Sequence, residues 1–434
     1  MSRSFGLGYV VPIAVGKALR LAGRLRGGGS AVPGWATLKL APQFLENALG
    51  QLEHGIVFVL GSNGKSTTTH MLTGVLRAHG LRVFTNPSGA NLPQGIASSL
   101  LAESTLTGRI DADIAVLEVD EAYALELAGI LKPTTVLALN TQVDQLYRFF
   151  ETERVADMML DTLALATEHI VANRDDPYLS KIDQRFANID TQVYPDIAFF
   201  GVSQKVIDAS PHGLVNARDY RAETEVGHAR SALSEVVETS RTGATIDVRG
   251  EQIEVVLPAK GLHYAIDAAA ALATTAVVLG DGFDGESAAR AFSTMKPAYG
   301  RGELLQFGSE QVEFVMFKNA ASLQLNLDAI PEPPEQVLFA IDEGTPDISW
   351  IYDVDFSSLD HVDIVTGAKA WQVSLCLAHH GVPIGAVEPD LERAIQLMRA
   401  LPAPAHGMKT WIVNYEQMML ARKHIGAGMQ ENRR

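Results

Sequence analysis

The segment VFVLGSNGKSTTT, residues 57–69, has the residue types of a loop that binds phosphate. Its glycines let the backbone approach oxygen atoms closely, and the amides at the start of the following helix point toward an anion. Lys65 can pair with the β- and γ-phosphates of a nucleotide, while the hydroxyl of Ser66 or Thr67 can hold Mg²⁺. The common phosphate loop has a glycine five residues before the glycine of its Gly-Lys pair. Five residues before Gly64 this chain has Val59, so the sequence indicates a shorter loop. The predicted nucleotide-binding residues of the loop are Gly61, Ser62, Asn63, Gly64, Lys65, Ser66 and Thr67.

Carboxylates follow a second apolar run, in the segment DIAVLEVDEA at 113–122. Glu118 ends that run, so its carboxylate is expected to emerge at the carboxyl edge of a sheet. Loops at the carboxyl ends of parallel strands are where ligands bind, which places Glu118 beside the phosphate loop. Asp120 and Glu121 come next, and we expect them to form helix caps or salt bridges.

The pattern around these residues alternates short apolar runs with longer helical segments. Runs at 55–61, 81–86, 113–122, 134–140 and 169–177 indicate strands of a parallel sheet that is covered by helices on both faces. The polar, alternating segment 204–255 indicates an antiparallel excursion. A second α/β unit is indicated by later runs at 312–317, 336–341, 361–367 and 409–415.

These patterns predict an α/β protein with three parts. A basic N-terminal segment, 1–50, is expected to lie on or near a central nucleotide-binding domain, 51–298, and a Rossmann-like α/β domain is expected over 299–434. Residues 1–45 contain six Lys or Arg and no acidic residue. This segment is too short to span a membrane, and two alternatives stay open: a helix docked on the main body, or contact with an anionic membrane surface.

Composition excludes several classes of protein. The formal net charge of −16 argues against a nucleic-acid partner, because binding to phosphate backbones needs concentrated Lys and Arg. A single cysteine, Cys376, rules out a disulfide framework within the chain and any zinc site built from several cysteines, and it fits a reducing cytoplasm. Apolar neighbours on both sides predict that Cys376 lies in a helix core and is not a nucleophile.

The short loop GSNGKSTTT resembles that of the Mur ligase superfamily, in which ATP activates a carboxylate as an acyl phosphate. Further segments follow in that superfamily's order, and the later ones resemble MurT-type subunits of lipid II isoglutaminyl synthase. The resemblance therefore implies a Mur ligase-like central domain and a MurT-type C-terminal domain. The matching segments include TNPSGANLPQGI (85–96), VLEVDEA (116–122), NRDDP (173–177), DISWIYDVDF (347–356), IVTGAKA (364–370) and VNYEQMMLARK (413–423).

The resemblance also implies roles for individual residues. Glu118 is expected to be a Mg²⁺ ligand, together with Ser66 or Thr67. Arg301 is expected to reach the γ-phosphate of ATP, where a planar cation offsets charge during transfer. Asp347 is expected to complete a Cys–His–Asp arrangement whose other members come from a GatD-type glutaminase partner in a heterodimer. The nearby Asp353 and Asp355 compete for that role, and a turn or cap role for Asp347 also stays open.

The implied reaction is the amidation of the D-glutamate α-carboxyl of lipid II to D-isoglutamine, with ATP, Mg²⁺ and ammonia, at the inner face of the membrane. The chain departs from the family pattern at several positions. Segment 204–255 has no cysteine, so no zinc is expected; Tyr264 and Asp267 replace the expected asparagines, and residues 318–322 read KNAAS. Two alternatives therefore stay open: a Mur-like ligase that adds an amino acid or peptide without a glutaminase, and a degenerate nucleotide-binding scaffold.

Overall fold

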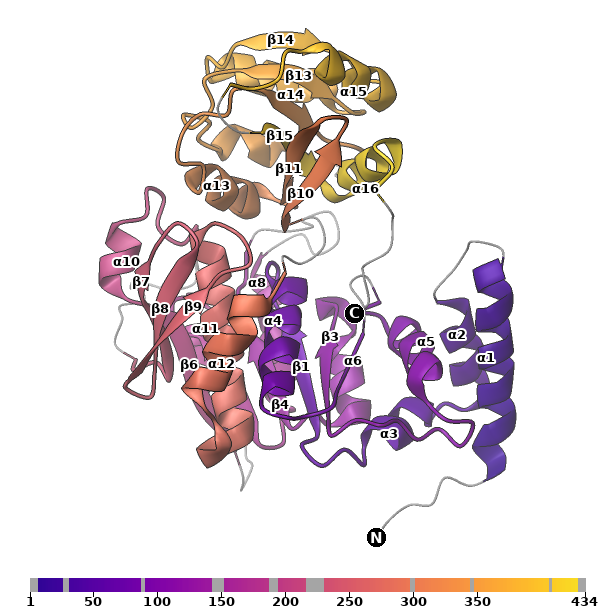
Figure 1. Ribbon diagram of the computed structural model, residues 1–434. Coiled ribbons are helices and arrows are strands. Elements are labelled where there is room, and N and C mark those ends of the chain that lie inside the picture. Colours follow the sequence, from indigo (N-terminus) through magenta and orange to yellow (C-terminus); the bar gives the residue numbers. More distant parts are fainter. Residues whose placement is uncertain are drawn as a thin grey trace.

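The strands of the protein form two separate sheets. The computed structural model describes residues 7–25, 31–86, 90–142, 152–186, 194–215, 230–296, 301–343, 347–405 and 408–427. Within these ranges one sheet has nine strands and the other has six, and Figure 1 shows the smaller sheet stacked above the larger one. The chain passes from the first sheet to the second between α12, which ends at Thr294, and β10, which begins at Arg301.

The nine-stranded sheet has the order β2-β3-β1-β4-β5-β6-β7-β8-β9. The strands from β2 to β7 pair in parallel, whereas β8 and β9 continue the edge as an antiparallel meander. The predicted parallel sheet and the predicted antiparallel excursion are both confirmed. The strands are β1 (Ile56–Leu60), β2 (Val83–Thr85), β3 (Ile114–Glu118), β4 (Thr135–Ala138), β5 (His169–Asn173), β6 (Asp196–Val202), β7 (Ser234–Thr239), β8 (Gly243–Val248) and β9 (Glu251–Val256).

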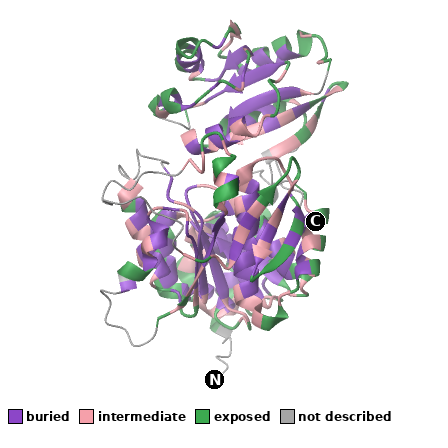
Figure 2. Ribbon diagram, turned by 90° about the vertical axis from the view of Figure 1, so that its left-hand side faces the viewer, coloured by how far each residue is buried: buried purple, intermediate pink, exposed green. Residues whose placement is uncertain are grey.

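Helices cover both faces of this sheet, and Figure 2 shows its central strands as buried. Along β1, Phe58 contributes to the core on one face while Val57 and Val59 contribute to the core on the other. Burial on both faces explains why this strand is a continuous apolar run with no alternation. One face packs against α3 (Phe44–Leu49), α5 (Pro93–Glu103), α6 (Glu121–Leu131), α8 (Thr152–Leu163) and α9 (Ile182–Phe186), and the other against α4 (Lys65–Ala78), α10 (Gln204–Asp208), α11 (Leu262–Leu279) and α12 (Gly285–Thr294).

Helix α11 is the most apolar helix of the first unit. The segment Leu262–Gly282 is long and apolar enough to cross a membrane by composition, but 67% of its most apolar window is buried inside the fold. Its alanines allow close packing against β5, β6 and β7. This segment is therefore a core helix of the nine-stranded unit.

The N-terminal segment forms two helices that dock on α5. Lys17 donates hydrogen bonds from Nζ to the carbonyl oxygens of Leu101, at 2.7 Å, and Ser104, at 2.6 Å. These carbonyls lie at the C-terminus of α5, where backbone acceptors lack helical partners and a cation is favourable. These two bonds hold α1 against the C-terminus of α5. Its elements are η1 (Leu7–Tyr9), α1 (Val10–Leu25) and α2 (Val32–Leu40).

The six-stranded sheet has the order β10-β11-β15-β12-β13-β14. Only the pair β10–β11 is antiparallel, so the predicted second α/β unit is confirmed. Its strands are β10 (Arg301–Phe307), β11 (Glu310–Phe317), β12 (Val337–Ala340), β13 (Val362–Thr366), β14 (Ile384–Val387) and β15 (Lys409–Asn414). Its helices are α13 (Ala320–Asp328), η4 (Ser349–Asp353), α14 (Ala370–His379), α15 (Leu391–Ala400) and α16 (Tyr415–His424).

Cys376 is part of the core of this second unit. It lies on α14, is fully buried, and contacts the carbonyl oxygen of Ile351 through Sγ at 3.5 Å. Burial raises the pKa of the Cys376 thiol to about 11. The predicted helix-core role of Cys376 is confirmed.

Candidate active site

The phosphate loop joins β1 to α4 with two glycines in conformations that other residues rarely adopt. The φ angle is 146° at Gly61 and 83° at Gly64, the residue that precedes α4. A Cβ atom at Gly64 would lie 2.4 Å from Oδ1 of Asp267, which is less than a van der Waals contact allows. Asp267, one of the positions where the chain departs from the family pattern, thus closes one side of the loop. Tyr264, the other such position, is buried in the core of the first unit.

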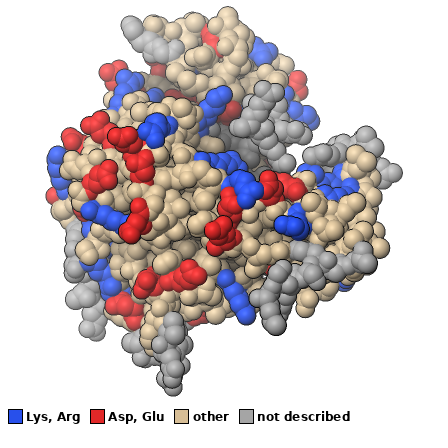
Figure 3. Space-filling view, turned by 60° about the horizontal axis from the view of Figure 1, so that its bottom comes forward, with Lys and Arg blue, Asp and Glu red and all other residues tan. Residues whose placement is uncertain are grey.

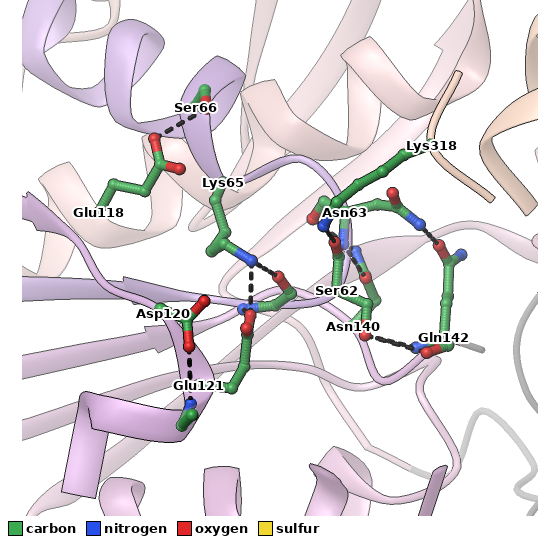
Figure 4. Close-up of polar contacts among 12 residues, drawn as sticks. Ser62, Asn63, Lys65, Ser66, Glu118, Asp120, Glu121, Asn140, Gln142 and Lys318 are labelled. Atoms are coloured by element: carbon green, nitrogen blue, oxygen red, sulfur yellow. Dashed lines mark hydrogen bonds and ion pairs between the residues drawn. The ribbon is translucent and has the colours of Figure 1, made fainter. Parts of the chain in front are cut away.

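Polar side chains at the carboxyl end of β4 hold the loop in place (Figure 4). Asn63 donates its backbone N–H to Oδ1 of Asn140 at 2.9 Å, and Asn140 returns a bond from Nδ2 to the carbonyl of Asn63 at 3.1 Å. Ser62 donates its hydroxyl to the carbonyl of Gln142 at 3.0 Å, and the side chain of Gln142 accepts from Asn63. These reciprocal bonds fix the backbone of the loop before any ligand arrives.

Lys65 is the cation of the loop and is itself buried, with 8% of its surface exposed. Its Nζ lies 2.5 Å from Oε1 of Glu121 and 2.5 Å from the carbonyl oxygen of Gly61. The same Oε1 of Glu121 accepts the backbone N–H of Gly61 at 3.3 Å. A carboxylate oxygen that meets a lysine and a loop amide occupies the environment of a phosphate oxygen. A phosphate that reached Lys65 would therefore have to displace Glu121.

The two acidic residues after β3 have the structural roles that the sequence predicted. Asp120 is the N-cap of α6, where its side chain accepts the backbone N–H of Ala122 at 3.1 Å. Glu121 forms a salt bridge with Lys65. The prediction of a cap or a salt bridge is confirmed for both residues.

Ser66 and Glu118 form a pair of oxygen donors beside the loop. The hydroxyl of Ser66 donates to Oε2 of Glu118 at 2.8 Å, and Glu118 is 5% exposed. Asn86, at the end of β2, accepts the backbone N–H of Glu118 at 2.9 Å and fixes this position. One carboxylate and one hydroxyl are a donor set that suits Mg²⁺, which keeps several waters and takes other oxygens from phosphate. Thr67, the alternative hydroxyl, is buried on α4.

A larger metal cluster is not found in the described part of the chain. There, no group of three His, Cys, Asp or Glu side chains has the arrangement of a metal site. A cation held by Ser66 and Glu118 would therefore depend on oxygens supplied by a nucleotide and water.

Two residues of the second unit contact the phosphate loop. Asn319 is 4% exposed and accepts from Nδ2 of Asn63 at 3.1 Å, while Nζ of Lys318 lies 3.3 Å from the carbonyl oxygen of Ser62. Asn319 also caps α13 in a reciprocal capping box with Ser322. The segment KNAAS, noted above as a departure from the family pattern, thus brings the second unit against the phosphate loop.

Four residues of this site were not predicted from the sequence: Asn86, Asn140, Gln142 and Asn319. A signal was available for Asn86 and Asn140, because each follows a predicted apolar strand at its carboxyl end. No pattern indicates Gln142, and the contact of Asn319 depends on how the two units pack together.

Arg301 and Asp347 lie in the second unit. Arg301 begins β10, where its backbone pairs with Val315 of β11, and its side chain is outside the described residues. Asp347 is exposed two residues before η4, and its Oδ1 accepts the backbone N–H of Ser349 at 2.8 Å. This backbone bond, together with a side-chain bond from Ser349, lowers the pKa of Asp347 below its ordinary value. Its carboxylate is therefore anionic at neutral pH.

Asp353 and Asp355, the competitors of Asp347, differ in their surroundings. Asp355 accepts the backbone N–H of Ser357 at 2.8 Å and lies 3.3 Å from Nε2 of His212 in the first unit. Asp353 is exposed at the end of η4. Asp355 thus belongs to the contact between the two units, whereas Asp347 presents its carboxylate to solvent.

Comparison with known proteins identifies both units. Residues 59–275 match the family model of the Mur ligase middle domain, and residues 316–418 match that of the MurT ligase C-terminal domain. The chain is similar to the lipid II isoglutaminyl synthase (glutamine-hydrolyzing) subunit MurT of Streptococcus pneumoniae, with 28% identity over 78% of each chain. The subunit of the same name from Staphylococcus aureus strain COL is 26% identical over 87% of this chain and 89% of that protein.

The fold is shared with solved Mur ligases. The MurF ligase from Thermotoga maritima in complex with ADP superposes with a TM-score of 0.62, at 18% identity over 91% of this chain and 84% of that one. The predicted α/β fold with a Mur ligase central domain is confirmed. The chain belongs to the Mur ligase family, and within it to the proteins with a MurT-type C-terminal domain.

Proposed function

We propose that this protein is an ATP-dependent carbon–nitrogen ligase that amidates the α-carboxyl of D-glutamate in lipid II to give D-isoglutamine. The convergence of Lys65, Ser66 and Glu118 on a short phosphate loop carries the proposal, in a chain whose relatives are named lipid II isoglutaminyl synthase subunits. The reaction would take place in the cytoplasm, at the inner face of the membrane. Residues that bind phosphate suit this reaction because a carboxylate is a poor electrophile until one oxygen becomes a leaving group.

In the first step, a carboxylate oxygen of the substrate attacks the γ-phosphorus of ATP. The new oxygen–phosphorus bond forms while the bond from that phosphorus to the bridging oxygen breaks, and ADP leaves. Lys65 would move from Glu121 to the β- and γ-phosphate oxygens and offset their charge, and Arg301 would assist from the second unit. Ser66 and Glu118 would hold Mg²⁺, which would neutralise part of the phosphate charge.

In the second step, ammonia attacks the carbonyl carbon of the acyl phosphate. The carbon–nitrogen bond forms, inorganic phosphate leaves, and nitrogen loses a proton to give the amide. The acyl phosphate must be protected from water during this time. The contacts of Lys318 and Asn319 with the phosphate loop show how the second unit approaches the site and support such protection.

Ammonia would come from a glutaminase partner, in which Asp347 would orient a histidine. A carboxylate on an imidazole fixes its tautomer and stabilises the imidazolium. The exposure of Asp347 and its lowered pKa support this role, because an accessible anion can accept the imidazole N–H of another subunit. The relatives are named as a subunit of a glutamine-hydrolyzing synthase, which supports a two-subunit enzyme.

Co-purification with a candidate glutaminase, followed by a glutamine-dependent amidation assay, tests the proposal. Lys65→Ala should abolish amide formation and leave the partner bound. Asp347→Asn should remove the use of glutamine and preserve activity with added ammonium, while Asp353→Asn, an exposed control six residues away, should change neither. Loss of both activities in Asp347→Asn contradicts the separate roles. Activity of the isolated chain with free amines favours a ligase without a glutaminase, and nucleotide binding without turnover favours a scaffold.

A further inference from the structure

Helix α1 presents an apolar face to solvent. Val11, Val15, Leu19 and Leu21 are 68%, 38%, 37% and 62% exposed. Their spacing, with exposed alanines at 14, 18 and 22, follows one side of a helix over its full length. Seven of the 21 exposed large hydrophobic side chains in the described residues lie between 11 and 40, so this apolar surface is concentrated and not scattered.

The opposite side of α1 fixes this orientation. Ile13 is fully buried, and a Cβ atom at Gly16 would lie 2.1 Å from Oγ1 of Thr37 on α2. Lys17 is bound to the C-terminal carbonyls of α5, as described above. The apolar face of α1 therefore points outward because the other face is already occupied by the protein.

Helix α2 adds an aromatic and a basic residue beside α1. Trp35 is 57% exposed, and Nζ of Lys39 lies 5.7 Å from its ring centroid. Val32, one turn earlier, is also 57% exposed. Tryptophan and lysine on one helix face are typical of segments at a membrane interface, because an amphipathic ring and a long basic side chain both suit the headgroup region.

Charge determines which partner fits this surface. Residues 1–45 contain six basic residues and no acidic one, which leaves 29 basic against 51 acidic residues in the rest of the chain. Figure 3 shows tan and blue at the right-hand end of the molecule, where α1 and α2 lie, and most of the red elsewhere. An anionic lipid surface would attract this end and repel the remainder, which would orient the protein.

We propose that the exposed face of α1, with Val32, Trp35 and Lys39 of α2, docks on an anionic membrane. The surface is connected to the active site through α5. The backbone N–H of Gly34 donates to Oγ of Ser98 on α5 at 2.8 Å, and Asn91, two residues before α5, accepts the backbone N–H of Asp120 at 3.2 Å. If the proposed function holds, this arrangement would present the active site to the headgroup of a lipid-linked substrate. The docking itself does not depend on that reaction.

Vesicle co-sedimentation of the full chain tests the docking directly. The probes are vesicles of phosphatidylglycerol with phosphatidylcholine, and vesicles of phosphatidylcholine alone. We expect the chain to bind the anionic vesicles, with an affinity that falls as the salt concentration rises. Brominated lipid should quench the tryptophan fluorescence of the bound chain, and Trp35→Phe should remove most of this quenching. The double variant Val15→Asp with Leu19→Asp should bind roughly tenfold or more weakly. Leu375→Asp, at an exposed leucine on α14, is the matched control and should bind normally.

Several results would overturn the proposal. No sedimentation with anionic vesicles, or equal binding by the double variant, would exclude this face as the docking surface. Analytical ultracentrifugation tests for a different occupant of this face. If the free chain forms a dimer, and the same substitutions dissociate it, then a second copy of the chain covers this face in place of a membrane. Thermal unfolding checks that the variants fold. Failure of the amidation assay with intact vesicle binding would reject the proposed function and leave the docking in place.

Discussion

Replacing Glu121 by Gln should strengthen nucleotide binding, although Glu121 lies beside the phosphate loop. In the structure, Oε1 of Glu121 meets Nζ of Lys65 at 2.5 Å and also accepts the N–H of Gly61. A phosphate must displace this carboxylate before it can reach Lys65. Gln keeps an acceptor oxygen at the same place but removes the charge that competes with phosphate.

The size of the effect follows from the burial of the pair. The side chains of Lys65 and Glu121 are each 9% exposed, and removing one partner of a buried ion pair costs about 3–5 kcal/mol. Because Gln retains the hydrogen-bond acceptor, we expect about 2 kcal/mol of destabilisation of the nucleotide-free protein. The bound state, in which Lys65 meets phosphate, should not lose this energy. The affinity for nucleotide should therefore rise roughly 30-fold, the factor that corresponds to about 2 kcal/mol.

Calorimetry with Mg²⁺ and a non-hydrolysable ATP analogue measures the affinity, and thermal unfolding with and without the analogue measures the stability. Without the analogue, the melting temperature of Glu121→Gln should be lower than that of the wild type. Addition of the analogue should raise the melting temperature of Glu121→Gln by more than it raises that of the wild type. Glu126→Gln, an exposed position on the same helix, should change neither quantity. Weaker binding in Glu121→Gln would refute the competition and make Glu121 part of the nucleotide site itself.

Three further predictions concern the loop and the core. Gly64→Ala should weaken nucleotide binding at least tenfold, because its Cβ would meet Asp267, while Gly80→Ala, with a φ of 90° and open space, should lower only stability, by about 1–2 kcal/mol. Ser66→Ala should raise the Mg²⁺ concentration needed for half-maximal activity roughly tenfold, whereas Ser66→Thr, which keeps the hydroxyl, should leave that concentration near the wild-type value. Because the pKa of Cys376 is raised from 9.0 to about 11, its contribution to stability is present below pH 9 and is lost between pH 9 and 11; native protein should react with a thiol reagent at pH 8 far more slowly than unfolded protein.

The main features of the fold and of the phosphate loop could be predicted because each depends on local sequence. The continuous apolar run 55–61 indicates a strand buried on both faces, and Gly64 followed by Lys65 indicates the loop and the helix after it. The packing of Cys376 was also predictable, because an apolar residue stands on each side of it in the sequence.

Contacts between distant segments could not be predicted in this way. Glu121 was expected to form a cap or salt bridge, but its partner Lys65 is 56 residues earlier and meets it only because β1 and β3 are neighbours in the sheet. The contact of Asn319 with Asn63 depends on the packing of two separate units. The exposed side of α1 could not be predicted from the sequence either, because the helical pattern does not indicate which side of the helix packs on α5.

The transfer of a carboxylate oxygen to phosphate tests the central claim most directly. The lipid-linked substrate would be labelled with ¹⁸O at both oxygens of the α-carboxyl of its D-glutamate and incubated with ATP, Mg²⁺ and ammonium. The inorganic phosphate would then be analysed by mass spectrometry. An acyl phosphate intermediate predicts one ¹⁸O in inorganic phosphate for each amide formed, with ADP as the other product. Amide formation with unlabelled phosphate, or with AMP and pyrophosphate as products, would contradict the account.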